Sequence, residues 1–301
     1  MNESIRTVVL NHDSTEPKII KRVGMGYYAD VYRFGYENKE SVIIKAYKKT
    51  GMMKNEVLQL QTLSEHTICP IPDVLWTHTA DEACPYDILA MTYIRGTVGG
   101  FVRYLRKDKK DRLAANIVDC LLSFHNTKNP DGFGEIGSDV RYKTFNEYYR
   151  QRVQQIMPMA EVLHKKGEIT DYVMSVMNKA IGQFDKIFYL PITEASLIHG
   201  DYNVWNIMVD KKNCRVSGVI DPCGCMWADS EFDLYQLLNY NGNGLKLFEA
   251  YRGKQKLSEN CEQKMAFYRL FTSVEHYYIS GHRVKQRKIK RSADALNVFL
   301  D

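Results

Sequence analysis

The segments HGDYNVWNIMVD (residues 199–210) and VIDPCGCMWADSEFDL (residues 219–234) decide the fold of this chain. The apolar runs IMV and RVSGVI flank a polar turn at residues 210–213, and this pattern predicts a β-hairpin. A hairpin brings its two ends together. Asn206, just before the first strand, and Asp221, just after the second, are therefore expected to be neighbours, with Asp201 in the loop that leads to them.

Three oxygen-bearing side chains around this hairpin admit two interpretations. Asp and Asn are common turn residues, so Asp201, Asn206 and Asp221 taken singly are equally well explained as hairpin caps. Together they supply what phosphoryl chemistry needs. Asp and Asn oxygens suit Mg²⁺, and a further carboxylate can accept a proton from an attacking hydroxyl. His199 and Gly200, directly before Asp201, favour the catalytic interpretation.

Residues 1–94 are predicted to form a small β-rich lobe with one helix. Runs of β-branched and aromatic residues at 19–47, and twice more before residue 94, alternate with turn residues and indicate strands. Apolar residues recur at helical spacing over residues 53–64 and predict an amphipathic helix. The glycine-containing segment IRGTVGG (94–100) is predicted to link this lobe to the rest of the chain.

Residues 95–301 are predicted to form a mainly helical lobe, in which the hairpin gives the only clear strand signal. Apolar stripes predict helices near residues 113–125, 145–165, 170–188, 233–252 and 260–280. The basic run HRVKQRKIKR (282–291) is predicted to be the solvated face of a last helix, with a basic arm for an anionic surface as the alternative. The predicted fold class is therefore α+β.

The first lobe contains three weaker signals for nucleotide chemistry. Gly24 and Gly26 lie between two predicted strands in the pattern G-x-G-x-x-A-x-V, where glycine lets backbone N–H groups approach a phosphate. Lys45 ends an apolar strand, and Glu56 lies on the following helix, so a Lys–Glu pair would orient the ammonium toward phosphates. Each signal alone has an ordinary explanation as a turn, a sheet-edge lysine or a solvated helix charge.

The composition of the 301-residue chain is that of an ordinary globular protein. Hydrophobic residues make up 45% and charged residues 26%, and a net charge of +5 gives no reason to expect a nucleic-acid partner. Seven scattered cysteines do not suggest a disulfide framework, so we expect reduced thiols and a cytoplasmic protein. The N-terminus lacks the apolar core of a secretory signal, and we expect no membrane span.

HGDYNVWNIMVD resembles the H-G-D-x-x-x-x-N catalytic loop of the aminoglycoside phosphotransferase and fructosamine kinase superfamily, small-molecule kinases of protein-kinase-like fold. VIDPCGCMWADSEFDL resembles the second signature of that superfamily, an I-D-P run followed by D-x-E-x-D-L. The first-lobe signals and ILAMTYIRG (88–96) fall in register with these motifs, so the resemblance spans most of the chain. The chain departs from the pattern at Ala29, where a third glycine is usual, and at Asn203 and Trp205 in the loop.

The resemblance implies roles for the residues at matching positions. Asp201 would be the catalytic base or would orient the acceptor hydroxyl, and Asn206 and Asp221 would hold Mg²⁺. Lys45, braced by Glu56, would contact the α- and β-phosphates of ATP. The remaining nucleotide contacts would come from Gly24 and Gly26, from Met91 behind the adenine, and from the backbone of Thr92–Ile94 beside it.

The resemblance also implies the class of substrate. Asp229 and Glu231 are candidates to face the acceptor, since carboxylates suit an amine-bearing molecule such as an aminoglycoside or a fructosamine, whereas Asp233 is expected at a helix N-terminus. Gly200 replaces the Arg of protein kinases, which disfavours a protein substrate. The implied function is transfer of the γ-phosphoryl group of ATP to a hydroxyl of a small, sugar-like amine. A choline or thiosugar kinase and a non-catalytic nucleotide-binding module are the alternatives.

Overall fold

The computed structural model describes residues 2–26, 28–102, 104–280 and 286–301. Its backbone divides into two compact units, Met1–Phe124 with Asp201–Cys225 and His125–Gly200 with Met226–Asp301. The predicted catalytic loop from Asp201 onward and the hairpin therefore belong with the N-terminal residues. The lobe boundary predicted after residue 94 stays a prediction.

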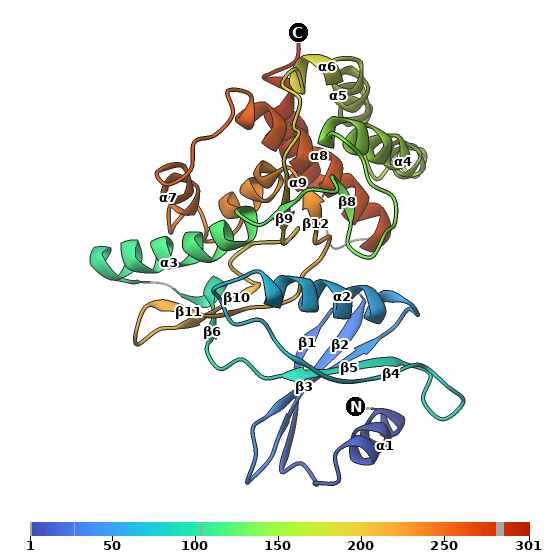
Figure 1. Ribbon diagram of the computed structural model, residues 1–301. Helices are drawn as coiled ribbons and strands as arrows, with labels where there is room; N and C mark the ends of the chain where they lie inside the picture. The colour runs from blue at the N-terminus through green and yellow to red at the C-terminus, as the bar shows by residue number, and fades with distance from the viewer. Residues whose placement is uncertain (1, 27, 103, 281–285) are drawn as a thin grey trace. The chain divides into compact units, whose positions relative to one another are not determined.

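An antiparallel five-stranded sheet is the centre of the first unit (Figure 1). Its strands are β1 (Ile19–Met25), β2 (Ala29–Gly35), β3 (Val42–Tyr47), β4 (Val74–His78) and β5 (Asp87–Thr92). They lie in the order β1-β2-β3-β5-β4. The predicted helix over residues 53–64 is α2 (Met52–Glu65), which connects β3 to β4.

The two faces of this sheet serve different purposes, because side chains alternate along a strand. One face is an apolar core, in which Ile44 and Ala46 of β3 pack with residues of β2, β5 and the N-terminal helix α1 (Glu3–His12). Val31 and Lys45, which alternate with core residues, line a pocket instead. A single strand thus supplies both the core and the site.

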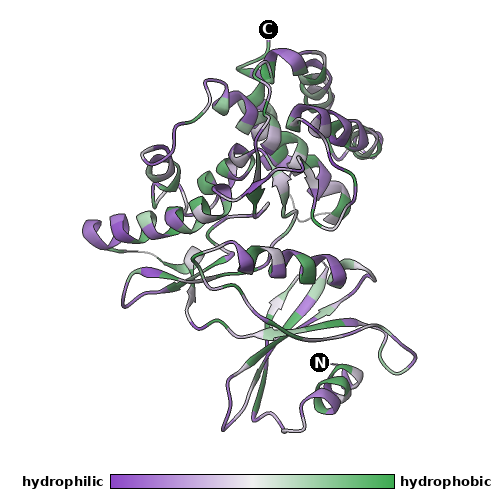
Figure 2. Cartoon of the chain, in the orientation of Figure 1, coloured by the Kyte–Doolittle hydropathy of each residue, from purple (hydrophilic) through white to green (hydrophobic). Residues whose placement is uncertain are grey.

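The predicted hairpin is present and is supported by a helix of the same unit. Its strands are β10 (Ile207–Asp210) and β11 (Arg215–Val219), and β6 (Thr97–Val98) pairs with the other edge of β10. The helix is α3 (Lys107–His125), whose first turns are polar (Figure 2). The backbone N–H of Val216 donates to Asn116 Oδ1 at 2.6 Å. The hydroxyl of Tyr202 donates to the carbonyl oxygen of Ile117 at 2.8 Å. Helix α3 therefore holds both the hairpin and the loop that contains Asp201.

A disulfide between Cys69 and Cys120 links the segment after α2 to α3. The two Cα atoms are 5.7 Å apart, which is an ordinary separation for this bond. The other five cysteines are free, four of them buried and Cys223 exposed. The expectation of reduced thiols is therefore wrong for Cys69 and Cys120 and agrees with the structure for the rest.

The second unit is mainly helical, as predicted, and has an aromatic core. Its α-helices are α4 (Phe145–Lys165), α5 (Asp171–Gly182), α6 (Phe184–Ile187), α7 (Leu247–Arg252), α8 (Cys261–Ser280) and α9 (Gln286–Asn297). Helix α4 begins where the Thr144 and Glu147 side chains form a capping box. Tyr149 of α4 then packs edge-on against Tyr268 of α8, with ring centroids 4.9 Å apart. These buried rings join the two longest helices of the unit.

A small antiparallel sheet leads into the predicted catalytic loop. Its strands, in spatial order, are β7 (Lys128–Asn129), β9 (Ala195–Ile198), β12 (Met226–Ala228) and β8 (Gly134–Glu135). Strand β9 continues directly into His199. The sequence does not predict these strands, because two to four residues are too few to show alternation.

The structure differs from the prediction at residues 233–252. Ser230–Leu238 is a 3₁₀ helix, and turns separate it from α7. The intervening Asn241-Gly242-Asn243-Gly244 explains the break, because glycine and asparagine favour turns over helix interiors. Of the basic run 282–291, residues 282–285 lie outside the described residues and the remainder begins α9. Over the described residues, we find no helix with the length and apolar character that crossing a membrane requires.

Candidate functional site

The predicted glycine loop is a tight turn between β1 and β2. The N–H of Gly26 donates to the carbonyl oxygen of Ala29 at 2.7 Å. A Cβ at position 26 would lie only 2.8 Å from that oxygen, so this turn requires glycine. Gly24 lies beside Val31, and both residues line the pocket of this unit that is described below. Tyr27 lies outside the described residues.

Lys45 is the charged centre of the site. Its Nζ donates to the two carboxylate oxygens of Glu56 at 2.8 and 2.6 Å, and to Asp221 Oδ1 at 2.6 Å. The hydroxyl of Tyr47 donates to the same Glu56 carboxylate at 2.6 Å. Strand β3 turns Lys45 away from the apolar core, α2 supplies Glu56, and the hairpin ends at Asp221. The structure thus brings together three predicted site residues from distant parts of the sequence.

Burial and charge act against each other in this cluster. Burial lowers the pKa of Lys45, but the carboxylates of Glu56 and Asp221 outweigh it, and the pKa of Lys45 is raised. Burial raises the pKa of Glu56, and the ammonium of Lys45 opposes that rise without cancelling it. The Asp221 side chain is 55% exposed, against 10% for Glu56. Lys45 is therefore firmly charged, while Glu56 depends on Lys45 for its ionised form.

Two amides hold the carboxylate of Asp201. Asn203 Nδ2 donates to Asp201 Oδ1 at 2.7 Å, and Asn206 Nδ2 donates to Asp201 Oδ2 at 2.8 Å. The backbone carbonyl oxygen of Asn206 accepts a hydrogen bond from the N–H of Ile220 at 2.9 Å. Because Ile220 directly precedes Asp221, this bond joins the two ends of the hairpin, as predicted. Asn203, where the chain departs from its superfamily pattern, therefore contacts the predicted catalytic residue itself.

One pocket of about 480 Å³ in the first unit contains most of the predicted nucleotide and metal residues. The predicted residues that line it are Gly24, Lys45, Glu56, Met91, Thr92, Ile94, Asn206 and Asp221. Asp201 does not line this pocket, but it is hydrogen-bonded to Asn206, which does. The lining combines the charged groups of Lys45, Glu56 and Asp221 with apolar groups such as Met91, which matches a ligand with an anionic part and a flat apolar part.

The segment predicted to meet the nucleotide base is only partly available to it. The N–H of Thr92 already donates to the carbonyl oxygen of Asp73 at 3.0 Å, and the N–H of Asp73 donates to Thr92 Oγ1 at 2.9 Å. Tyr93 and Ile94, which follow the end of β5, line the pocket beyond this pairing. The guanidinium of Arg33 lies over the ring of Tyr93, 4.3 Å from its centroid. Tyr93 lies within the predicted segment, whereas Arg33 is a pocket residue that the sequence does not single out.

Trp205 forms an aromatic part of the pocket wall next to Asn206. Its side chain packs against Phe101, with ring centroids 4.8 Å apart at 84°. A Cβ at Gly100 would lie 2.7 Å from the indole, so Gly100 makes room for the ring. Trp205 is 36% exposed. A large aromatic surface is thus presented at the pocket by the loop that contains Asp201.

In the second unit, Asp233 holds the backbone that precedes Asp201. Its carboxylate accepts hydrogen bonds from the N–H of His199 at 2.8 Å and from the N–H of Gly200 at 2.9 Å. Asp233 is fully buried, as is His199. Asp233 lies in the first turn of the 3₁₀ helix, near its N-terminus as predicted, and Asp229 is the N-cap residue of that helix. His199 and Gly200 therefore shape the entry to the loop, as their sequence positions suggest.

Asp229 and Glu231, the candidate acceptor residues, form a buried network with Lys264 of α8. Lys264 Nζ lies 2.7 Å from Asp229 Oδ2 and 2.8 Å from Glu231 Oε2. Tyr268 and Ser258 donate further hydrogen bonds to these two carboxylates, at 2.7 and 2.6 Å. Burial lowers the pKa of Lys264, but the attraction of the two carboxylates is stronger, so the pKa of Lys264 is raised. These contacts give both acids a structural role rather than one at a substrate.

Three contributors to the site carry little signal in the sequence. Lys264 lies within an ordinary amphipathic helix, and nothing in its neighbourhood indicates buried carboxylates. Asp233 has the signal of the D-x-E-x-D-L motif, but the motif does not say which backbone groups it binds. Trp205 stands out by its position beside Asn206, and only the structure shows the space that Gly100 leaves for it.

Comparison with known proteins places these features in a family context. The model of the phosphotransferase enzyme family matches residues 19–268. Ketosamine-3-kinase of Mus musculus is 23% identical over 246 residues, which cover 80% of this chain and 72% of that protein.

Solved structures resemble the fold over almost the whole chain. A proposed fructosamine-3-kinase from Haemophilus somnus 129PT has a TM-score of 0.75 at 14% identity, covering 99% of this chain and 97% of that one. A thermostable mutant of aminoglycoside phosphotransferase APH(4)-Ia, solved with AMP-PNP and hygromycin B, has a TM-score of 0.71 at 13% identity, covering 98% and 97%. The predicted α+β fold is thereby confirmed.

Proposed function

The chain belongs to the phosphotransferase enzyme family and is a small-molecule kinase, and we propose that it transfers the γ-phosphoryl group of ATP to a hydroxyl of a small, amine-bearing, sugar-like acceptor. One observation carries this proposal: Lys45 binds both Glu56 and Asp221 at the wall of a pocket of about 480 Å³. A lysine kept charged by two carboxylates suits a polyphosphate. Relatives named for ketosamine, fructosamine and aminoglycoside substrates support an acceptor that contains an amine.

ATP would bind in the pocket of the first unit. The glycine turn would cover the phosphates, and Lys45 would contact the α- and β-phosphates while Glu56 keeps its ammonium in place. The adenine would lie beside Met91, with the backbone at Tyr93 and Ile94 as its hydrogen-bonding edge. Residues 1–94 would thus be the nucleotide lobe, and residues 95–301 would supply the catalytic loop and the acceptor site.

The donor atoms at the hairpin ends fit a magnesium ion. Asp221 offers a half-exposed carboxylate, and Asn206 uses its amide nitrogen on Asp201, which leaves its side-chain oxygen for a cation. Mg²⁺ prefers such oxygen ligands and takes one or two of them from the protein, with phosphate and water for the rest. When bound, the ion would neutralise charge on the phosphates. Asp221 would then exchange its contact with Lys45 for one with the metal.

Asp201 would act on the acceptor hydroxyl. A carboxylate accepts the proton of the attacking hydroxyl and fixes its direction. The amides of Asn203 and Asn206 orient the two oxygens of Asp201, and the bonds from His199 and Gly200 to Asp233 fix the backbone just before it. Catalysis by this arrangement would come mostly from positioning and from neutralising charge.

A coupled assay of ADP release tests the proposal directly. The acceptor panel consists of fructosamines, ribulosamines, aminoglycosides and choline, each with Mg²⁺ and ATP. We expect turnover with at least one sugar amine, and none when the matching sugar lacks its amine. Turnover with choline alone would contradict the sugar-like acceptor. ADP release that no member of the panel stimulates would contradict the proposal as a whole.

A further inference from the structure

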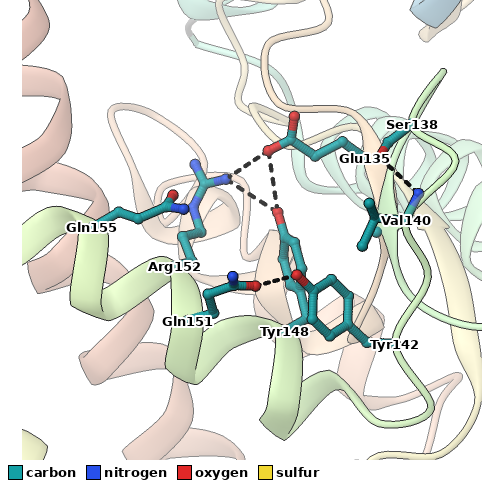
Figure 3. A pocket seen from close by; sticks show the side chains of 9 residues that line it. Glu135, Ser138, Val140, Tyr142, Tyr148, Gln151, Arg152 and Gln155 are labelled. Atoms are coloured by element: carbon teal, nitrogen blue, oxygen red, sulfur yellow. Dashed lines mark hydrogen bonds and ion pairs between the residues drawn. The ribbon is translucent and has the colours of Figure 1, made fainter.

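A second pocket, of about 220 Å³, lies wholly within the second unit, between β8 and α4 (Figure 3). One wall is a single face of α4, because Tyr148, Gln151, Arg152 and Gln155 follow each other at helical spacing. Glu135 of β8 closes the opposite side. Most of its lining residues are polar, and none of them belongs to the site described above.

Arg152 is the fixed charge of this pocket. Its Nη2 binds both carboxylate oxygens of Glu275 at 2.9 and 3.2 Å. Its Nη1 is directed toward the Tyr148 hydroxyl at 3.2 Å. Burial lowers the pKa of Arg152, but the effect of the Glu275 carboxylate and the Tyr148 oxygen is stronger, so the pKa of Arg152 is raised. Arg152 is therefore charged, held in place and already neutralised by Glu275.

Glu135 is the loosely held charge. Its carboxylate approaches the Tyr148 hydroxyl at 3.4 Å and Arg152 Nη1 at 3.5 Å, both long for hydrogen bonds, and its side chain is 65% exposed. Figure 3 shows Glu135, Tyr148 and Arg152 pointing toward one another across the pocket. Glu275 is nearly buried and lies closer to Arg152, so Glu135 is the more weakly held of the two carboxylates and the one that a ligand can reach. Arg141, a cation of the segment between β8 and α4, donates through Nη1 to the backbone carbonyl oxygens of Glu135 and Val140.

These charges define a ligand. An ammonium group would satisfy Glu135, whereas a carboxylate would meet both Glu135 and Glu275. Hydroxyl groups suit the rest of the lining, because Arg152 Nη1 donates and the amides of Gln151 and Gln155 both donate and accept. Tyr142, whose hydroxyl is bonded to Gln151, adds an aromatic edge. We propose that this pocket binds a small hydroxylated amine, with its ammonium on Glu135 and a hydroxyl on Arg152.

Such a molecule has two possible sources. It is either the phosphoryl acceptor or a second amine that is bound without being phosphorylated. The first of these two sources rests on the proposed function. The binding step itself requires no kinase activity. Binding and turnover can therefore be measured separately, and failure of one does not imply failure of the other.

Calorimetric titration of the full chain with glucosamine, without nucleotide, tests the binding. We expect glucosamine to bind, and glucose to bind at least ~10-fold more weakly, which corresponds to about 1.4 kcal/mol. Glu135→Gln should cause a similar loss for glucosamine and none for glucose. Glu161→Gln is the matched control, since Glu161 is an exposed acid of the same helix, about 14 Å along the axis from Arg152.

The binding results decide whether the proposal holds, and the kinetic results decide which source the ligand has. No binding of glucosamine, equal binding of glucose and glucosamine, or an equal loss in both variants would overturn the proposal. Kinetics then identifies the source. If the ligand is the acceptor, Glu135→Gln raises the KM for the amine at least ~10-fold and leaves the KM for ATP unchanged. If it is a second amine, glucosamine binds without stimulating ADP release and does not compete with the acceptor found in the panel.

Discussion

Replacing Lys45 by Met removes the cation that keeps two carboxylates in place. Glu56 is buried and loses both hydrogen bonds from Lys45 Nζ, keeping only the one from the Tyr47 hydroxyl. Asp221 is 55% exposed, so water replaces much of what it loses. Breaking a buried pair typically costs ~3–5 kcal/mol of unfolding free energy. Because Tyr47 remains and Asp221 is half exposed, we expect a loss near the lower end, about 3 kcal/mol at pH 8.

The pH dependence of this loss identifies its cause. Burial raises the pKa of Glu56, and Lys45 is the group that opposes this rise, so the pKa rises further in Lys45→Met. An acid with a raised folded-state pKa is more stable in the folded protein at low pH, where it is protonated, and loses that stability as the pH rises. We therefore expect the deficit of the variant to shrink from about 3 kcal/mol at pH 8 to below about 1 kcal/mol at pH 5.

Urea unfolding at pH 8 and pH 5 measures this deficit. Lys48→Met is the matched control, because Lys48 is a solvent-exposed lysine paired with the carboxylate of Asp30. It should lose less than ~1 kcal/mol at both pH values. A deficit for Lys45→Met that is the same at pH 5 and pH 8, or no larger than that of Lys48→Met, would refute the account of this cluster.

Three further predictions concern the first unit. Mg²⁺ and ATP should quench tryptophan fluorescence, because Trp205 lines the pocket, and Trp205→Phe should abolish the change. Cys223 is exposed, but desolvation by the surrounding residues, followed by the Asp201 and Asp221 carboxylates, raises the pKa of its thiol to about 12. The rate of its alkylation, measured by mass spectrometry at pH 8, should be roughly 50- to 1,000-fold lower than that of free cysteine. This rate should increase with pH and should be higher in Asp221→Asn. Cys69→Ser opens a disulfide that spans 51 residues and should lower the unfolding free energy by about 4 kcal/mol in a urea titration without reductant.

The elements that the sequence predicts well are those with long periodic patterns. Helix α4 begins at Phe145 and ends at Lys165, as the helical pattern predicts, and α8 begins one residue after its predicted start. The hairpin follows from two β-branched runs around a polar turn, and its geometry brings Asn206 next to Asp221 through the bond to Ile220. These predictions succeed because the signals are local and repeat over many residues.

The parts that escape prediction depend on contacts between distant residues. The buried Lys264 selects Asp229 and Glu231 as partners only once α8 packs in place, so a sequence pattern cannot tell these acids from substrate ligands. Asn203 looks like a departure from a motif until its amide is seen on Asp201. The pairing of Cys69 with Cys120 requires the approach of α3 to the segment after α2, which no spacing rule contains.

The chemistry assigned to Asp201 is tested most directly by Asp201→Asn. The change keeps the shape of the side chain and removes its ability to accept the proton of a hydroxyl. Its effect is measured as turnover with the best acceptor of the panel, together with the affinity for Mg²⁺ and ATP by calorimetry. We predict a fall in kcat of roughly 10²- to 10⁴-fold with nearly unchanged nucleotide affinity. Near-normal turnover in Asp201→Asn would contradict the account.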